Sequence, residues 1–275
     1  MGHVRRYRRP DGRLTQLMNT PPPLSISAFF PAYNDAGTIA SMVVTTLMTL
    51  REIASDYEVI VVNDGSRDHT AAVLDELAHL YPDEVRIIHH PQNRGYGGAL
   101  RTGFASATKE WIFYTDGDAQ YDPRELKNLA ALVDGKVDFI NGWKIERNDP
   151  WLRIIIGRIY QYLIKFLFGL QLKDVDCDFR LMRRSIFDTV NLTFDSGVIC
   201  VELMKKVQDA GFILTETPVH HFHRAYGRSQ FFNFPRLFRV ALDLRHLWWR
   251  LVVRQEHKRQ PAPSSLTQPS DNSSA

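Results

Sequence analysis

The sequence predicts an α/β fold built on a mostly parallel sheet with helices on both faces. Two observations lead to this prediction. Short apolar segments alternate with helical patterns between residues 24 and 141, and residues 57–62 are apolar almost throughout. A strand covered on both faces is apolar on both sides. Strands that alternate with helices form parallel neighbours joined by right-handed crossovers.

The individual elements follow from the length of each pattern and from the turn residues around it. In the first part of the chain we expect strands at residues 24–30, 57–62, 85–89, 111–115 and 137–141, and helices at residues 36–53, 70–80, 98–108 and 123–133. Pro123 suits the first turn of its helix, where the missing N–H is not needed. After residue 141 the alternation breaks. There we expect helices at residues 151–168, 197–210 and 233–253, and strands at residues 179–183 and 212–223.

The composition indicates a globular protein with basic ends. The 275 residues are 44% hydrophobic and 24% charged, and the net charge is +3. We expect a flexible basic arm at residues 1–23 and a main domain at 24–230, divided into halves at 24–142 and 143–230. An amphipathic, membrane-proximal helix at 231–254 and a disordered tail at 255–275 follow. Arginines crowd both ends, which suggests an anionic partner. No nucleic-acid-binding motif is recognisable, so nucleic acid is not expected.

The cysteines and the apolar segments indicate a compartment. Cys177 and Cys200 form no CxxC pair, which suggests a reducing environment without a disulfide framework. We find no N-terminal signal-type segment and no apolar run of about 18 residues. The sequence therefore predicts a cytoplasmic protein.

Two carboxylates, Asp116 and Asp118, follow the strand at residues 111–115 with Gly117 between them. Asp and Gly are turn residues, so a simple turn is one interpretation. The other is a divalent metal site, because neighbouring buried carboxylates repel one another unless a cation lies between them.

The other strand-end clusters favour a metal-bound nucleoside diphosphate. Carboxyl ends of parallel strands meet at one edge of a sheet, where ligands bind. Tyr33 offers a face for stacking, Asp64 an acceptor for base N–H groups, and Arg94 a cation. A glycine cluster at residues 95–98 allows phosphate to approach the start of a helix. Because this cluster follows the third strand rather than the first, a dinucleotide-binding dehydrogenase is disfavoured.

These clusters resemble, in order, the signature motifs of family 2 glycosyltransferases with the GT-A fold, and within them the polyprenyl-phosphate sugar synthases of the dolichyl-phosphate mannose or glucose synthase type. The matching segments are Pro31-Ala32-Tyr33-Asn34, Asn63-Asp64-Gly65-Ser66, Gly95-Tyr96-Gly97-Gly98-Ala99 and Asp116-Gly117-Asp118-Ala119-Gln120. The later segments Asp178-Phe179-Arg180 and Arg224 to Ser229 are similar to motifs of the same subgroup. Two departures are Asp178, where the subgroup has Gly, and Gln230, where it has Lys.

The resemblance implies roles for matching positions. The nucleotide-sugar pocket would comprise Pro31, Tyr33, Asp35, Asp64, Arg94, Gly95, Asp116 and Gly117. Mg²⁺ or Mn²⁺ would be held by Asp116 and Asp118, with Gln120 completing the metal shell. Asp116, Asp118 and Arg224 would be the catalytic residues, with Arg224 meeting phosphate. The implied reaction is inverting transfer of a sugar from a GDP- or UDP-sugar to a polyprenyl phosphate.

The acceptor remains the open choice. A phosphate acceptor is already ionised and needs cations, for which the candidates are Arg147, Arg153, Arg158, Arg180, Arg224 and Arg228. A hydroxyl acceptor needs a carboxylate base, for which the candidates are Asp174, Asp176, Asp178 and Glu202. A nucleotidyltransferase and a non-catalytic nucleotide-binding membrane subunit are further alternatives.

A lipid acceptor requires contact with a membrane. The helix at residues 151–168 is amphipathic, which fits either a buried core helix or one lying in the membrane interface. The last helix interleaves aromatic residues with arginines, as suits the headgroup region. We therefore expect peripheral association with the cytoplasmic membrane face, directly or through a membrane partner subunit. His220, His221 and His223 are not expected to form a zinc site, because strand neighbours point to opposite faces.

Overall fold

The protein is described by a computed structural model over residues 7–8, 14–15, 24–145, 151–224 and 234–258. Side chains are not described at 7–8, 14–15, 151–156 and 234–237. Two short strands, β1 (Tyr7–Arg8) and β2 (Leu14–Thr15), pair antiparallel within the predicted basic arm. The rest of that arm and the predicted tail beyond residue 258 lie outside the described residues.

The main domain is built on a seven-stranded sheet with the order β5-β4-β3-β6-β8-β7-β9. Its strands are β3 (Leu24–Ala32), β4 (Ala54–Asn63), β5 (Val85–His89), β6 (Trp111–Thr115), β7 (Phe139–Ile145), β8 (Phe179–Arg183) and β9 (Leu214–His220). Neighbours are parallel except around β8, which runs antiparallel to both β6 and β7. The predicted α/β fold with a mostly parallel sheet is confirmed.

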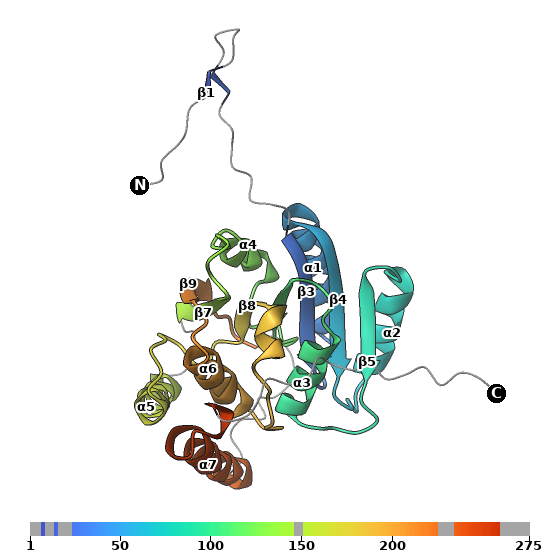
Figure 1. Ribbon diagram of the computed structural model, residues 1–275. Helices are drawn as coiled ribbons and strands as arrows, with labels where there is room; N and C mark the ends of the chain where they lie inside the picture. Colours follow the sequence, from blue (N-terminus) through green and yellow to red (C-terminus); the bar gives the residue numbers. More distant parts are fainter. Residues whose placement is uncertain (1–6, 9–13, 16–23, 146–150, 225–233, 259–275) are drawn as a thin grey trace, which may run out of the picture.

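Helices cover both faces of this sheet (Figure 1). They are α1 (Ile39–Ile53), α2 (Thr70–Leu80), α3 (Tyr96–Ser106), α4 (Leu126–Ala130), α5 (Trp151–Phe168), α6 (Ile199–Asp209) and α7 (Phe234–Trp248). One apolar core lies between the sheet and α1, α2 and α4, and the other between the sheet and α3, α5, α6 and α7. This three-layer arrangement explains why the central strands are apolar on both faces.

The predicted helix at residues 123–133 is shorter than expected. A 3₁₀ turn at Pro123–Glu125 leads into α4, which ends at Ala130. Asp122 caps the turn, because its side chain accepts a hydrogen bond from the backbone N–H of Arg124. The chain then turns through Gly135, whose φ of 81° lies in the left-handed region that favours glycine.

The sheet brings its functional loops to one edge, which we call the rim. Ala32 pairs with Asn63 and Phe29 with Tyr114, so the loops that follow β3, β4 and β6 leave the sheet together. Because β8 is reversed, its first residue, Phe179, pairs with Thr115 at the end of β6. The segment before β8 therefore reaches the same rim as the loops after its neighbours.

Helix α5 buries one apolar side in the core and exposes other apolar residues on its outer side. Ile164 and Phe168 are buried in the core, whereas Tyr162 and Phe166 are 72% and 85% exposed. Helices α5 and α7 lie side by side (Figure 1), and the indole N–H of Trp248 donates to the carbonyl of Leu167 at 2.9 Å. Within the part of the chain that the structure describes, no helix is long and apolar enough to cross a bilayer.

Candidate functional site

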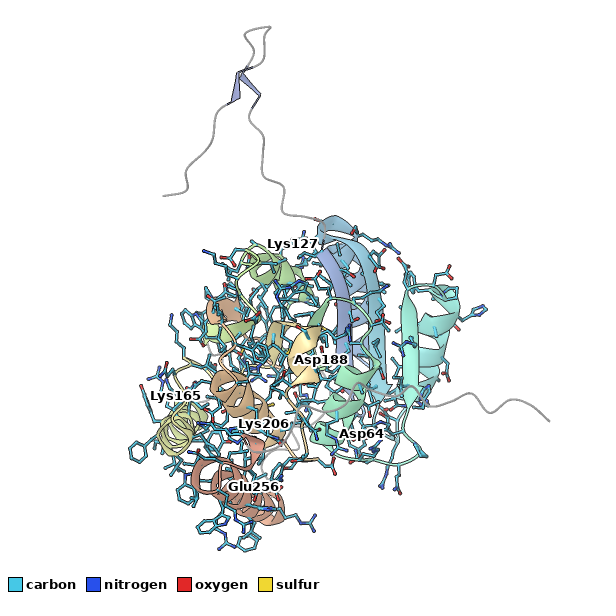
Figure 2. All side chains as sticks on the ribbon, in the orientation of Figure 1. Asp64, Lys127, Lys165, Asp188, Lys206 and Glu256 are labelled. Atoms are coloured by element: carbon cyan, nitrogen blue, oxygen red, sulfur yellow. The ribbon has the colours of Figure 1, made fainter. Side chains whose placement is uncertain are left out.

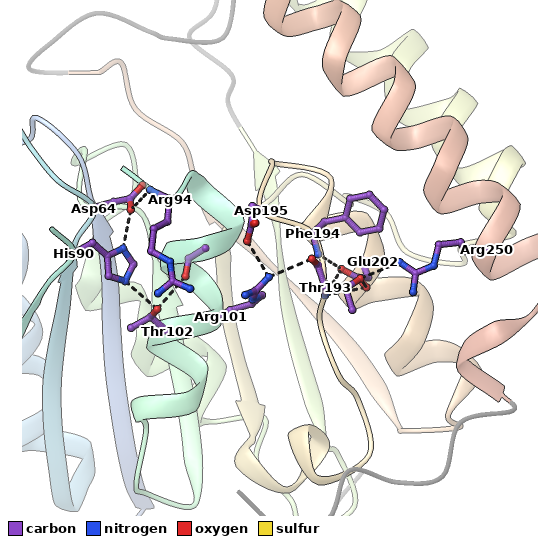
Figure 3. Close-up of polar contacts among 11 residues, drawn as sticks. Asp64, His90, Arg94, Arg101, Thr102, Thr193, Phe194, Asp195, Glu202 and Arg250 are labelled. Atoms are coloured by element: carbon purple, nitrogen blue, oxygen red, sulfur yellow. Dashed lines mark hydrogen bonds and ion pairs between the residues drawn. The ribbon is translucent and has the colours of Figure 1, made fainter. Parts of the chain in front are cut away.

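The loop after β4 is fastened to the loop after β5 through Asp64. Its Oδ1 accepts hydrogen bonds from His90 Nδ1 at 2.7 Å and from the Arg94 backbone N–H at 2.8 Å (Figure 3). Asn93 Nδ2 donates to the Asp64 carbonyl at 3.0 Å. A Cβ on Gly65, whose φ is 66°, would lie 2.6 Å from the backbone nitrogen of Asn93. These contacts fix the Asp64 side chain before any ligand arrives.

The loop after β3 carries Asp35, which faces Arg224 from beyond β9. Asp35 Oδ2 accepts the Tyr33 backbone N–H at 3.0 Å. Arg224 Nη2 lies 3.6 Å from Asp35 Oδ1 and 3.3 Å from Asp118 Oδ2. Burial raises the pKa of Asp35 to about 6, although Arg224 opposes the shift. The arginine thus brings together residues from β3, β6 and β9.

Asp116 and Asp118 lie at the end of β6, as the motif predicted. Tyr96 at the start of α3 donates its hydroxyl hydrogen to Asp116 Oδ1 at 2.8 Å. Burial raises the pKa of Asp116 well above its usual range, and the nearby Asp178 and Asp118 raise it further. Burial also raises the pKa of Asp118, against the attraction of Arg224. A cation placed here would relieve both effects.

The donor set fits a divalent metal completed by a ligand. Among the described residues, no group of three or more His, Cys, Asp or Glu side chains is arranged to hold an ion. Mg²⁺, however, commonly uses one or two carboxylates together with substrate phosphates, and Asp116 and Asp118 match that pattern. Gln120 donates its side-chain N–H to the Phe222 carbonyl at 3.1 Å, which ties this loop to the chain after β9. Its role as a metal ligand stays a prediction.

The glycine cluster at the start of α3 packs against the backbone of Phe194 and Asp195. A Cβ on Gly95 would lie 2.5 Å from the Asp195 carbonyl oxygen, and one on Gly97 would overlap the Phe194 carbonyl oxygen. The Gly97 N–H donates to the Asp195 carbonyl at 2.8 Å. Arg101 Nη1 contacts Asp195 Oδ1 at 2.8 Å (Figure 3). In this structure the close approach expected for phosphate is made by residues 193–195.

Arg180, predicted to meet the acceptor phosphate, is fully buried in the sheet. Its guanidinium donates to Asn141 Oδ1 at 3.0 Å, to the Val175 carbonyl at 2.6 Å and to the Tyr114 hydroxyl. The structure therefore assigns it to the core, where it supports the segment before β8. Of the other acceptor candidates, Arg224 lies at the rim and Arg158 on the outside of α5. Arg147, Arg228 and the side chain of Arg153 lie outside the described residues.

The four candidate bases occupy different environments. Glu202 is buried in an ion pair with Lys206, 2.7 Å away, and holds Thr193. Asp174 is buried and Asp176 partly buried in the loop before β8. Asp178 lies close enough to Asp116 and Asp118 to raise their pKa values. Asp178 is therefore the candidate base that the structure places beside the carboxylate pair.

His220 ends β9 and His221 follows it, and both contact residues of the 121–125 segment. His220 Nδ1 contacts Glu125 Oε1 at 2.5 Å, and its ring stacks on Phe222. The ring of His221 packs edge-on against Tyr121.

Sequence reasoning missed His90, Tyr96 and the 193–195 loop. His90 directly follows a strand, and a polar residue in that position was the available signal. Tyr96 lies inside the glycine cluster, where only the glycines were interpreted. The 193–195 loop carries no motif, because its role rests on a long-range contact with Gly95 and Gly97.

Together, the mixed sheet, its helical layers and the carboxylate-lined rim define the protein as an α/β enzyme of the GT-A class. The chain belongs to glycosyl transferase family 2, whose family model matches residues 27–190. It is therefore a glycosyltransferase.

A curated relative and several solved structures extend this comparison. The chain is 28% identical over 219 residues to the undecaprenyl-phosphate 4-deoxy-4-formamido-L-arabinose transferase of Enterobacter sp. (strain 638). The match covers 80% of this chain and 66% of that protein, so this chain spans about two thirds of the relative's length.

Two structures of glucosyl-3-phosphoglycerate synthase from Mycobacterium tuberculosis share the fold. One, with Mn²⁺, UDP and phosphoglyceric acid, has a TM-score of 0.63 and 17% identity over 88% of this chain and 80% of that chain. Another, with Mg²⁺ and UDP, has a TM-score of 0.60 and 16% identity over 88% of this chain and 81% of that chain. At these identities the likeness concerns the fold alone.

Proposed function

We propose that the protein transfers a sugar, with inversion, from a GDP- or UDP-sugar to a polyprenyl phosphate at the membrane surface. The observation that carries this proposal is the meeting of Asp35, Asp116, Asp118 and Arg224 at one rim. The rim combines carboxylates suited to a divalent metal with a cation suited to phosphate. The curated relative is an undecaprenyl-phosphate transferase, which supports the acceptor class.

The residues divide the work of the reaction. Asp116 and Asp118 would hold Mg²⁺ or Mn²⁺, and such an ion supplies neutralisation of the departing nucleoside diphosphate. Arg224 contributes positive charge on the same side of the site. An acceptor phosphate oxygen forms the new bond to the anomeric carbon, while the bond from that carbon to the nucleotide breaks and the leaving oxygen keeps the electron pair. The acceptor is already an anion, so no side chain has to remove a proton.

Product analysis tests the proposal directly. The full chain would be incubated with radiolabelled nucleotide sugars, polyprenyl phosphate and Mn²⁺, and the lipid fraction analysed. We expect a labelled lipid-phosphate-linked sugar and release of nucleoside diphosphate. Absence of a labelled lipid with all common GDP- and UDP-sugars would exclude the proposed acceptor, and release of pyrophosphate would indicate a nucleotidyltransferase.

Transfer to a hydroxyl is the second candidate, because Asp178 lies beside the carboxylate pair. Asp178→Asn keeps an oxygen that can accept from Tyr114, which contacts Asp178 Oδ1 at 3.2 Å. A hydroxyl acceptor would make this variant about 10²–10⁴-fold slower, the usual contribution of a general base. With a phosphate acceptor we expect kcat to change by less than about tenfold, since no proton is transferred.

We further propose that helices α5 and α7 contact the cytoplasmic membrane face. We call the exposed apolar residues of these two helices and of the π-helical turn at Trp249–Val253, which follows α7, the outer apolar patch. They are Ile159, Tyr162, Leu163, Phe166, Phe238, Leu242, Trp249 and Val253. Lys165 on α5 (Figure 2) and the exposed Arg158, Arg239 and Arg245 provide cations for anionic headgroups. A membrane partner subunit is the alternative occupant.

Vesicle sedimentation tests this contact. Phe166→Glu places a charge in the patch and should reduce binding of the full chain to anionic vesicles. Met48→Glu is a matched control, because Met48 is 60% exposed on α1, on the other side of the sheet. Equal binding by both variants would exclude the patch as the contact surface.

A further inference from the structure

We infer that His90 and the Arg94 backbone N–H make Asp64 selective for a uridine nucleotide, an inference that rests on the proposed function. Both groups donate to the same oxygen, Oδ1, at 2.7 and 2.8 Å. The described residues give no hydrogen bond to Oδ2. The ligand therefore meets a carboxylate with one oxygen already taken by two protein donors.

Asp64 lies at the rim, where we propose that the nucleotide binds. Asp64 directly follows β4, and its N–H donates to the Ala32 carbonyl at 2.9 Å. Tyr33, the next residue after Ala32, therefore starts the neighbouring loop, and Arg94 lies next to Asp64 (Figure 3). Asp64 is only 3% exposed, so a base reaches it by one edge contact rather than by lying across it.

The His90 ring is held from both sides, which fixes its orientation. Its Nδ1 contacts Asp64, and its Nε2 lies 3.0 Å from Thr102 Oγ1 on α3 (Figure 3). The His90 backbone N–H also donates to the Asn63 carbonyl at 2.9 Å. Because Asp64 is acceptor-only when ionised, the hydrogen on Nδ1 must point to it. Asp64 consequently cannot rotate to offer both oxygens without breaking these contacts.

Counting donors then distinguishes the bases. The imide edge of uracil has one donor, N3–H, which matches one free oxygen. Guanine presents two adjacent donors, which are best matched by both oxygens of a carboxylate. The corresponding edge of cytosine has an acceptor at N3, which a carboxylate repels. We therefore expect UDP to bind about 5- to 150-fold more tightly than GDP or CDP, which is the range that one missing or mismatched hydrogen-bond pair produces.

Calorimetric binding of UDP, GDP and CDP to the full chain, with Mn²⁺ present, tests this selection. Asp64→Asn is the sharpest variant, because the amide is isosteric and only its oxygen can accept from His90 and Arg94. The amide N–H₂ then replaces Oδ2, so the ligand meets a donor instead of an acceptor. We expect at least about tenfold weaker UDP binding and a preference for CDP over UDP. Unchanged UDP binding by this variant would overturn the inference.

His90→Leu tests the positioning role separately. Removing its donor leaves only the Arg94 backbone N–H on Oδ1, so this oxygen can also accept from the base. The ratio of UDP to GDP affinity should therefore fall to less than about threefold. The matched control is His89→Leu, because His89 contacts Asn63 and Asp75 but not the Asp64 carboxylate. A ratio that falls equally in both variants would overturn the role of His90. Should His90→Leu fail to fold, the Asp64→Asn result still decides the inference.

The outcomes separate this inference from the proposed function. Nucleotides that bind to the wild type without discrimination, or with GDP preferred, overturn the uridine selection and leave sugar transfer standing. Uridine preference without any transfer to lipid phosphate upholds the selection and overturns the proposed function. Absence of binding by all three nucleotides overturns both.

Discussion

Gly97 provides a test of what the glycine cluster is for. In Gly97→Ala the new Cβ would overlap the Phe194 carbonyl oxygen and lie 2.8 Å from the carbonyl carbon of Asp195. Both are backbone atoms, which cannot rotate away as a side-chain tip can. The 193–195 loop must therefore move, and the 2.8 Å hydrogen bond from the Gly97 N–H to Asp195 lengthens or breaks.

The expected change in the free energy of unfolding follows from these contacts. Overpacking costs about 1–3 kcal/mol, and loss of the hydrogen bond about 1 kcal/mol. The better helix propensity of Ala returns about 0.5–1 kcal/mol. We therefore expect the free energy of unfolding, measured by urea denaturation, to fall by about 2 kcal/mol. The control is Gly197→Ala, because no atom lies within 4 Å of a Cβ at Gly197.

The alternative for Gly97 is close approach of a phosphate. In that case Gly97→Ala would leave the urea midpoint unchanged and weaken nucleoside diphosphate binding. Unfolding curves that coincide for Gly97→Ala, Gly197→Ala and the wild type would refute the steric argument.

Three further predictions concern carboxylates. Tyr96→Phe removes the hydroxyl donor to Asp116 and should weaken Mn²⁺ binding in the presence of nucleotide about tenfold, measured by calorimetry. The control is Tyr57→Phe, which removes a hydrogen bond to Glu84 away from the rim and should leave Mn²⁺ binding unchanged. Asp118→Asn should lower kcat about a hundredfold or more with an unchanged unfolding midpoint, and retained transfer would favour a non-catalytic role for the pair. Burial, opposed by Lys144, raises the pKa of Asp176 to about 6, so stability should fall as pH rises from about 4 to about 6. Asp176→Asn cannot ionise and should be about 1–2 kcal/mol more stable than the wild type at pH 8, after discounting the shift for partial exposure, and equal to it at pH 4.

The fold was predictable where strands are short, apolar on both sides and bounded by polar turns. Strands β5, β6 and β8 begin and end at the predicted residues. The reversed direction of β8 was not predictable, because an apolar run of five residues has the same pattern in either direction. Its direction is set by pairing with β6 and β7, which are distant in the sequence.

The candidate site was predictable as a set of carboxylates but not as a network. Motif order indicated Asp64, Asp116 and Asp118, because each lies within three residues of the end of a strand. Their partners depend on tertiary contacts, as when Tyr96 reaches Asp116 from another element. Arg180 was not predictable as a buried residue. Arginine is mostly found at the surface, and nothing in the sequence around Arg180 indicated that its side chain is buried in the core.

The reversed strand β8 gives the rim two kinds of loop. The loops after β3, β4 and β6 precede crossover helices, so a change in their length also shifts a helix. Asp178 instead lies at the rim immediately before β8, whose first residue, Phe179, pairs with Thr115. Under the proposed function, insertions ahead of β8 would therefore alter the acceptor side of the site without shifting the helices that follow β3, β4 and β6. The nucleotide side and the acceptor side would in this way be separable along the chain.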